Sequence, residues 1–308
     1  MSIVPGPSSN RVVESSGLLN IHKPIGPTSR AMVDCIGRLI RKTKVGHAGT
    51  LDPLASGVLV LCVGSSTRLI EYVQRSSKSY RAVIRLGATS DTLDADGTIE
   101  ERESPPIPTR DQVESVLATQ VGTILQVPPQ YSALKVGGKR AYDLARSGET
   151  AALEPRPVEI ERAELIAFEW PRVEIEVDCG SGTYIRSIAR DVGEALGCGG
   201  LIEVLTRTRI GDFRLDDAAA PEEFSSASDV RSRLIPPVRA LGGMPRIVVG
   251  PAEIADLVQG RSVSVPGSIA GETALVSSTG DLCAIAEYDP VSGRAAPRRV
   301  FASDSRSA

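Results

Sequence analysis

The spacing of hydrophobic residues predicts a chain that alternates between strands and helices. In the segments Gly17–Lys23 and Val58–Val63 the apolar residues run together, as they do in buried strands. From Ser79 to Leu86 they alternate with polar residues, which is typical of an antiparallel strand with one buried face. After Thr28 or Ser29, which can cap a helix, apolar residues recur at helical spacing and form one face: Met32, Ile36, Leu39 and Ile40.

The second half of the chain continues this pattern. Strands are expected near 156–168 and 172–179, followed by a helix that opens after Gly180-Ser-Gly182 and runs to Leu196. A further strand is predicted from Leu205 to Phe213. The mixture of strands and helices indicates the α+β class.

Differences in composition and in predicted elements divide the chain into three parts. Residues 1–16 contain Pro, Gly and Ser without the charged-then-apolar pattern of a signal peptide, so we expect a disordered leader there. Residues 17–240 carry the alternating elements and form the predicted main domain. After a hinge near 235–245, short strands and turns with one helix predict a small β-rich domain over 244–305.

Composition excludes several classes of protein. Hydrophobic residues make up 41% of the chain, enough for ordinary cores, but no stretch approaches the 18 apolar residues of a transmembrane helix. Five cysteines without a Cys-x-x-Cys pair favour a reduced cytoplasmic protein with buried thiols. The net charge is −3, yet residues 1–80 hold ten basic and four acidic residues. A localised basic face on an acidic protein suits a structured polyanion.

Candidate chemistry is restricted by the scarcity of histidine. His22 and His47 are the two histidines of the chain, which excludes a His-rich metal site and most His-based acid–base catalysis. The acidic turn Asp91–Gly97 lacks the later bidentate Glu of an EF-hand loop, so no metal is expected there. An enzyme with this sequence would have to use carboxylate, Tyr, Lys or Arg side chains.

The most informative segment is GHAGTLDPLASGV at residues 46–58, which holds a single carboxylate, Asp52, between glycines. Pro53 biases Asp52 towards an extended backbone, and the glycines allow a bulky ligand to approach closely. An alternative interpretation is that Asp52 caps a helix with Pro53 at its first position. The two interpretations are compatible, because a capping residue can also act as a nucleophile.

Seven motifs in order resemble those of the TruB-type tRNA pseudouridine-55 synthases, over about Gly17 to Phe301. Any one of them is weak alone, and the specificity lies in their order and spacing. They are the Asp52 loop, His22-Lys23-Pro24, Lys78-Ser-Tyr80, Asp94-Ala-Asp96-Gly97, Tyr131-Ser-Ala-Leu-Lys135, Gly182-Thr-Tyr184-Ile-Arg186 and Gly293–Val300.

The resemblance implies a pseudouridine synthase fold with a bent, mixed but mainly antiparallel sheet, and a PUA-like RNA-binding domain at the C-terminus. It implies isomerisation of uridine 55 in the T loop of tRNA to pseudouridine, without cofactor or metal. The expected partner is the tRNA T stem-loop, bound by a cytoplasmic monomer with no membrane and no obligate protein partner.

The resemblance also implies roles for individual residues. Asp52 matches the catalytic aspartate, although attack on C1′, addition to the ring and removal of a sugar proton all stay open. Arg186 matches the active-site arginine, whose guanidinium would oppose the effect of burial on the ionised carboxylate. Asp94 matches an acidic residue that pairs with this arginine, which implies a gating or positioning role for Asp94. Tyr80 matches the tyrosine that lies against the flipped base and takes part in removing the C5 proton.

The remaining implied residues surround the nucleotide. Tyr184 should line the pocket and Leu205 should close it by apolar contact. His47 matches a histidine that stacks near the extruded nucleotide, where stacking compensates for the lost base stacking of the RNA loop. Lys23 and Pro24 are expected to support the catalytic loop from beneath.

Three other functions compete with this interpretation. A guide-RNA-dependent synthase of the dyskerin type is disfavoured, because the chain lacks long Lys-rich extensions. A tRNA-folding chaperone would rely on binding more than on catalysis. A carboxylate glycosidase would need a second acid at suitable spacing, and no partner motif is evident.

Overall fold

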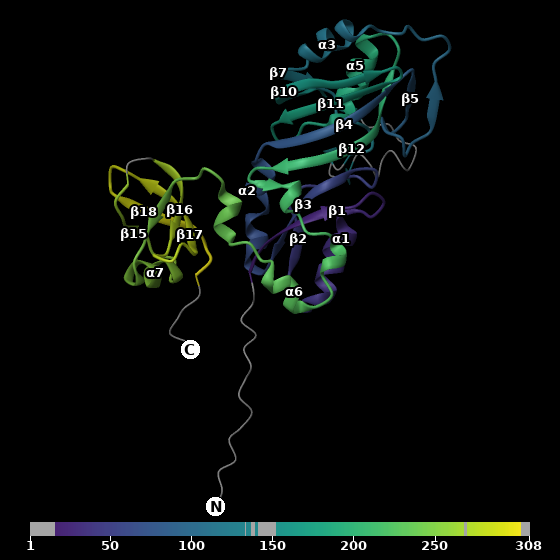
Figure 1. Ribbon diagram of the computed structural model, residues 1–308. Coiled ribbons are helices and arrows are strands. Elements are labelled where there is room, and N and C mark those ends of the chain that lie inside the picture. Colours follow the sequence, from purple (N-terminus) through teal and green to yellow (C-terminus); the bar gives the residue numbers. More distant parts are fainter. Residues whose placement is uncertain (1–15, 133, 137–138, 141–151, 268–269, 303–308) are drawn as a thin grey trace, which may run out of the picture.

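The computed structural model describes residues 16–132, 134–136, 139–140, 152–267 and 270–302. The predicted leader at 1–16 therefore lies outside the described residues, except for Ser16. In the described chain, two sheets dominate the architecture, one of nine strands and one of five strands (Figure 1). This arrangement confirms the predicted α+β class with mainly antiparallel strands.

The nine-stranded sheet runs in the order β1-β3-β12-β4-β11-β10-β7, with β2 paired to β3 and β13 paired to β12. All neighbours are antiparallel except β3 and β12, which are parallel. The strands are β1 (Gly17–Lys23), β2 (Val45–His47), β3 (Ser56–Val63), β4 (Lys78–Leu86), β7 (Gly122–Gln126), β10 (Arg156–Glu169), β11 (Arg172–Cys179), β12 (Gly200–Ile210) and β13 (Phe213–Arg214).

Helices pack against this sheet at both ends (Figure 1). Helices α3 (Arg110–Ala118) and α5 (Ile185–Ala195) pack in one core with β4, β10, β11 and β12. Helix α1 (Ser29–Leu39) packs with β1 and β3 in a second core, together with α6 (Ala227–Ser232). Thr28 caps α1, because its side chain accepts a hydrogen bond from the N–H group of Ala31.

Shorter elements connect these parts. A 3-10 turn (Gly64–Leu69) leads into α2 (Ile70–Arg75), and two small hairpins project from the main sheet. The first hairpin pairs β5 (Ala88–Ser90) with β6 (Ile99–Glu101), and the second pairs β8 (Lys135–Val136) with β9 (Lys139–Arg140).

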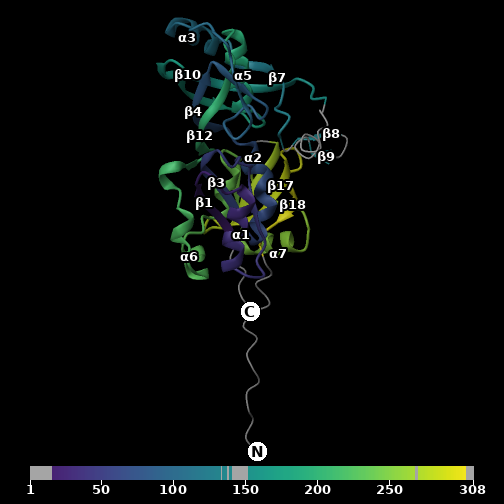
Figure 2. The same ribbon diagram turned by 90° about the vertical axis from the view of Figure 1, so that its right-hand side faces the viewer.

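The five-stranded sheet forms the C-terminal part of the described chain, in the order β14-β16-β17-β18-β15. Its elements are β14 (Arg246–Val248), α7 (Pro251–Val258), β15 (Val263–Ser264), β16 (Gly271–Val276), β17 (Leu282–Asp289) and β18 (Arg294–Val300). This sheet lies beside the half of the molecule that contains α1 and α2, away from α3 and α5 (Figures 1 and 2). The β-rich character is as predicted, whereas the PUA-like identity and the domain boundaries stay predictions.

Helix α2 connects the two sheets. The ring of Tyr72 packs in one apolar cluster with Ala274, Val276 and Leu282 of the C-terminal sheet. Its hydroxyl donates a hydrogen bond of 2.6 Å to the carboxylate of Glu272. Burial and this carboxylate raise the pKa of Tyr72 to about 12. The contact therefore joins the two sheets at one side of α2.

One strand prediction was wrong in its bounds. The strand expected from Leu205 to Phe213 begins at Gly200 and stops at Ile210, and β13 follows after a turn. The turn occurs because Gly211 adopts a φ of +52°, which interrupts an extended strand. The early start reflects pairing that local periodicity does not reveal, since Gly200 to Ile202 pair with Leu86 to Ile84 of β4. Ile202 also exchanges backbone hydrogen bonds with Leu93 and Ala95.

No helix among the described residues is long and apolar enough to cross a membrane.

Candidate active site

The loop between β2 and β3 carries Asp52 and is fixed from two sides. Ser29 at the start of α1 brackets Leu51: the N–H group of Leu51 donates to Oγ at 2.8 Å, and Oγ donates to the Leu51 carbonyl at 3.0 Å. The N–H group of Gly26 donates to the carbonyl of Pro53. Asp52 and Pro53 lie in irregular backbone and start no helix, so the capping interpretation is wrong. The side chain of Asp52 is 39% exposed.

Arg207 of β12 supports this loop from inside the protein. Its guanidinium donates to the carbonyls of Val58, Thr50 and Gly49, at 2.8, 3.2 and 3.2 Å. Gly57 is required where β3 passes Arg207, because a Cβ atom there would lie 2.2 Å from the Arg207 carbonyl oxygen. The backbone before Asp52 is thereby held by a buried cation.

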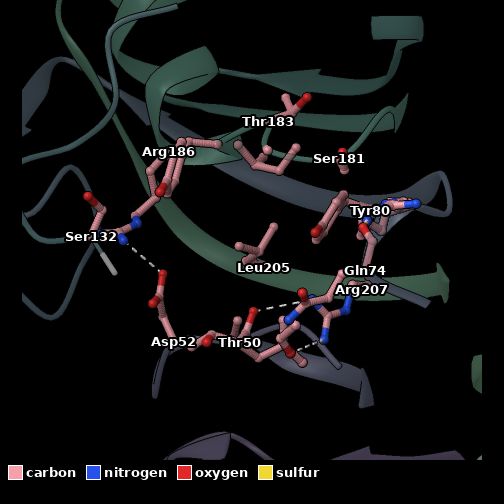
Figure 3. Close-up of a pocket in the computed structure, with 18 of the residues that line it drawn as sticks. Thr50, Asp52, Gln74, Tyr80, Ser132, Ser181, Thr183, Arg186, Leu205 and Arg207 are labelled. Carbon is pink, nitrogen blue, oxygen red and sulfur yellow. Dashed lines mark hydrogen bonds and ion pairs between the residues drawn. The ribbon is translucent and has the colours of Figure 1, made fainter. Parts of the chain in front are cut away.

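Arg186, the second residue of α5, lies between the carboxylates of Asp52 and Asp94. Figure 3 shows its guanidinium directed at Asp52. Its side chain is 6% exposed, and its Nη2 atom is 2.9 Å from Oδ2 of Asp52. Its Nη1 atom is 3.3 Å from Oδ2 of Asp94. The guanidinium also donates to the carbonyls of Thr92 and Tyr131, both at 2.8 Å. These four contacts leave the guanidinium one orientation, with Nη2 directed at Asp52.

The start of α5 is itself fixed by a side chain of β7. The N–H group of Tyr184 donates to Oε1 of Gln126 at 2.8 Å, and Nε2 of Gln126 donates to the Tyr184 carbonyl at 3.1 Å. Tyr184 is the residue immediately before α5. The two hydrogen bonds therefore fix the start of the helix, and with it the backbone position from which the Arg186 side chain extends to Asp52.

Asp94 is buried behind Arg186 and is not among the residues that line the pocket. Its Oδ1 atom accepts hydrogen bonds from the Thr92 hydroxyl at 2.5 Å and from the N–H group of Asp96 at 3.2 Å. Burial raises the pKa of Asp94, while the Thr92 hydrogen bond and the Arg186 charge oppose that rise. This geometry favours the predicted positioning role, which acts through Arg186.

A pocket of about 550 Å³ opens beside Asp52. Tyr80 and Leu205, from neighbouring strands β4 and β12, form its apolar floor (Figure 3). Tyr184 lines the same pocket and has the guanidinium of Arg156 5.0 Å from its ring centre. The remaining lining residues are Gly49, Thr50, Leu51, Ala55, Glu71, Gln74, Arg75, Lys78, Ser132, Ser181, Gly182, Thr183, Ile185, Arg186 and Arg207.

Tyr80 presents a neutral hydroxyl to this pocket. Its side chain is buried, and burial raises the pKa of Tyr80, with the charge of Arg207 acting in the opposite direction. The predicted strand alternation also holds, since Tyr80 shares its buried face with Ala82 and Ile84 while Arg81 is exposed.

The three other predicted residues lie outside the pocket lining. His47 is half-buried in β2, burial lowers its pKa, and its Nδ1 atom has no hydrogen-bond partner among the described residues. Lys23 is fully buried at the end of β1 and donates to the carbonyl of Pro24 at 2.8 Å. Burial outweighs the attraction of Asp52 and lowers the pKa of Lys23 to about 8. Support of the Asp52 loop by Lys23 and Pro24 and stacking by His47 both stay predictions.

Three further residues build the site, and the sequence pattern did not predict a role in it for them. Ser29 was treated as a helix cap, but its hydroxyl holds the backbone of Leu51. Arg207 was not included, although it follows Leu205 at the spacing that puts both on one face of a strand. Lys78 was quoted within a motif without a role, and it lines the pocket two residues before Tyr80. In each strand, alternate residues share a face, which places Lys78 beside Tyr80 on β4 and Arg207 beside Leu205 on β12. This alternation was the sequence signal that could have identified both cations.

The chain shares its fold with several solved structures. It resembles a chain in a structure of an H/ACA RNP bound to a substrate RNA containing 2′-deoxyuridine, with a TM-score of 0.72, 22% identity and coverage of 94% and 86% of the two chains. A Cbf5-Nop10-Gar1 complex gives a TM-score of 0.71 and 23% identity, covering 94% of this chain and 84% of the other. These likenesses identify the fold of the chain, in which the carboxylate–guanidinium pair of Asp52 and Arg186 lies beside the pocket.

Sequence comparison gives the family. Residues 37–185 match the model of the TruB family pseudouridylate synthase, N-terminal domain. A tRNA pseudouridine synthase B from an Azoarcus species is 40% identical over 297 residues, covering 96% of this chain and 97% of the relative. One from Cereibacter sphaeroides is 41% identical, covering 93% and 96%. The chain belongs to the TruB family of pseudouridine synthases.

Proposed function

We propose that the protein converts uridine 55 in the T loop of tRNA to pseudouridine, with Asp52 as the catalytic carboxylate. The observation that carries this proposal is the Arg186–Asp52 ion pair at the mouth of the pocket. The curated relatives, which are named tRNA pseudouridine synthase B, support tRNA as the substrate. We further propose a monomeric cytoplasmic enzyme that binds the T stem-loop without an obligate protein partner.

The pocket suits a single everted pyrimidine. A base withdrawn from a folded RNA loop loses stacking worth a few kcal/mol. Aromatic contact returns on the order of 1–3 kcal/mol per base. Tyr80 and Tyr184 supply such surfaces, and Leu205 supplies apolar contact between them. The bound ribose then faces Asp52, whose negative charge meets C1′ as the bond from C1′ to N1 breaks.

Arg186 directs this carboxylate. A guanidinium held by Asp94 and by two carbonyls cannot turn away from Asp52, so the carboxylate keeps one orientation when the nucleotide enters. Such preorganisation is the main electrostatic means by which enzymes lower a barrier. The isomerisation needs no external reactant, because the same uracil leaves and returns through C5.

The experiment that tests this function uses purified protein and an unmodified tRNA transcript. We expect pseudouridine at one T-loop position, mapped by carbodiimide labelling and primer extension. Modification at another position would contradict the site assignment, and no modification of the transcript would contradict the function.

The Tyr80 hydroxyl is expected to act in turnover more than in binding. In Tyr80→Phe the ring and its contact with the base remain, but the hydroxyl that could assist loss of the C5 proton is gone. General acid–base groups contribute about 10²–10⁴-fold, so single-turnover rates should fall by that order while RNA affinity is kept. Equal losses of rate and affinity would contradict a catalytic role for the hydroxyl.

A further inference from the structure

Lys78 and Arg207 place two buried cations at the inner end of the pocket. Lys78 is 8% exposed and Arg207 is 2% exposed, yet both line the cavity. Lys78 lies two residues from Tyr80 on β4, and Arg207 lies two residues from Leu205 on β12. The two cations therefore adjoin the two side chains that form the floor beneath the base.

Neither cation is neutralised within the described part of the chain. The Lys78 ammonium donates to the carbonyls of Gln74 and Ser76, at 2.5 and 2.6 Å, and Arg207 donates to three carbonyls. No carboxylate of the described residues lies within ion-pair distance of either group, whereas Arg186 has two carboxylate partners. The carbonyl oxygens stabilise these two cations but do not neutralise them, so the inner end of the pocket carries positive charge.

This arrangement is costly to the folded protein. Burying a charge without a counter-charge is unfavourable, and the effect shows at Lys78, where burial and the neighbouring Arg207 lower the pKa to about 8. A lysine with an ordinary hydrogen-bonding role could be replaced by a neutral donor at no such cost. The charge is therefore best explained by an anion that is present only during the reaction.

We propose that Lys78 and Arg207 stabilise the detached uracil as an anion while it turns in the pocket. This inference rests on the proposed function. When the bond from C1′ to N1 breaks, its electron pair leaves with the base and makes uracil an anion. C5 of the uracil anion then bonds to C1′ with an electron pair of the ring. The C5 proton is lost and N1 gains a proton, so that substrate and product are isomers. Lys78 and Arg207, which adjoin the pocket floor, lower the energy of the uracil anion that exists between cleavage from N1 and bonding to C5.

The test compares Lys78→Met with the unaltered enzyme on two RNAs, which carry uridine or 5-fluorouridine at the target position. Fluorine withdraws electrons and stabilises the uracil anion by itself, so it should replace part of what Lys78 supplies. We expect Lys78→Met to slow single-turnover C1′–N1 cleavage by about 10²-fold with uridine, the order found for loss of one stabilising donor. With 5-fluorouridine we expect the loss to shrink to about tenfold or less.

The controls separate this role from folding and from phosphate binding. Arg81→Met removes one cation from the exposed face of the same strand, where Arg81 pairs with Glu174, and should leave both rates unchanged. Lys78→Arg keeps the charge and should recover most of the lost rate. RNA affinity, measured by filter binding, should be unaffected by Lys78→Met, and a large loss of affinity would identify a phosphate contact instead.

Two outcomes would overturn the proposal: equal slowing of both RNAs by Lys78→Met, or no slowing of either. If Lys78→Met does not fold, the same comparison between the two RNAs is made with Lys78→Arg, whose residual defect must again be smaller with 5-fluorouridine. Failure of the proposed function is distinguishable, because the unaltered enzyme would then form no pseudouridine at all.

Discussion

Replacing Asp52 by asparagine is expected to abolish pseudouridine formation and to leave RNA affinity almost unchanged. The amide keeps the size of the side chain but removes the charge that C1′ meets. Loss of an essential nucleophile or base typically costs about 10⁴–10⁶-fold, so the single-turnover rate should fall below detection. The other groups of the pocket are unchanged in this variant, so RNA affinity should survive.

Two measurements check this expectation. Single-turnover assays with tritium-labelled tRNA report the rate, and filter binding reports the affinity. Asp34→Asn is a matched control, because Asp34 is a partly exposed acid of α1 that pairs with Arg30 and lies outside the site. Normal modification by Asp52→Asn would favour the chaperone or another catalytic group, and would remove Asp52 from the chemistry.

Replacing Arg186 by lysine is also expected to produce a large loss, about 10²–10³-fold in single-turnover rate. A lysine keeps the charge but cannot contact Asp52, Asp94 and two carbonyls together, because it lacks the planar fork of donors. The carboxylate of Asp94 would remain buried with a weakened partner, and Asp52 would lose its fixed orientation. The change should therefore act on rate far more than on RNA affinity.

Arg190→Lys is the matched control for this variant. Arg190 lies one turn further along α5 and donates to Asp191 and to the carbonyl of Val127, with no contact to Asp52. We expect its rate to stay near that of the unaltered enzyme. Equal rates for Arg186→Lys and Arg190→Lys would show that the ion pair with Asp52 has no role in the reaction.

Much of the fold could be predicted from local pattern. The helical face of α1 and the alternation of β4 were correct, because each is a repeat that burial imposes on neighbouring residues. The start of β12 was missed because Gly200, Leu201 and Ile202 pair with the end of β4, more than a hundred residues earlier in the chain. Pairing with a distant strand does not change the hydrophobic pattern of the sequence, so the pattern does not show where such a strand begins.

The candidate site divides in the same way. Asp52 and Arg186 could be found by resemblance to a family, and the structure brings them within 2.9 Å. The roles of Ser29 and Arg207 could not be read from the sequence, because both act on backbone atoms of the Asp52 loop. A hydrogen bond to a carbonyl requires no particular residue at the receiving position, so no motif records it.

The most direct test of the central claim is a crystal structure of Asp52→Asn bound to a T stem-loop RNA. The account predicts that uridine 55 is everted into the pocket, with its base against Tyr80 and Leu205 and its C1′ atom beside residue 52. A structure in which the RNA is bound but uridine 55 stays stacked in its loop, or lies away from residue 52, would contradict it.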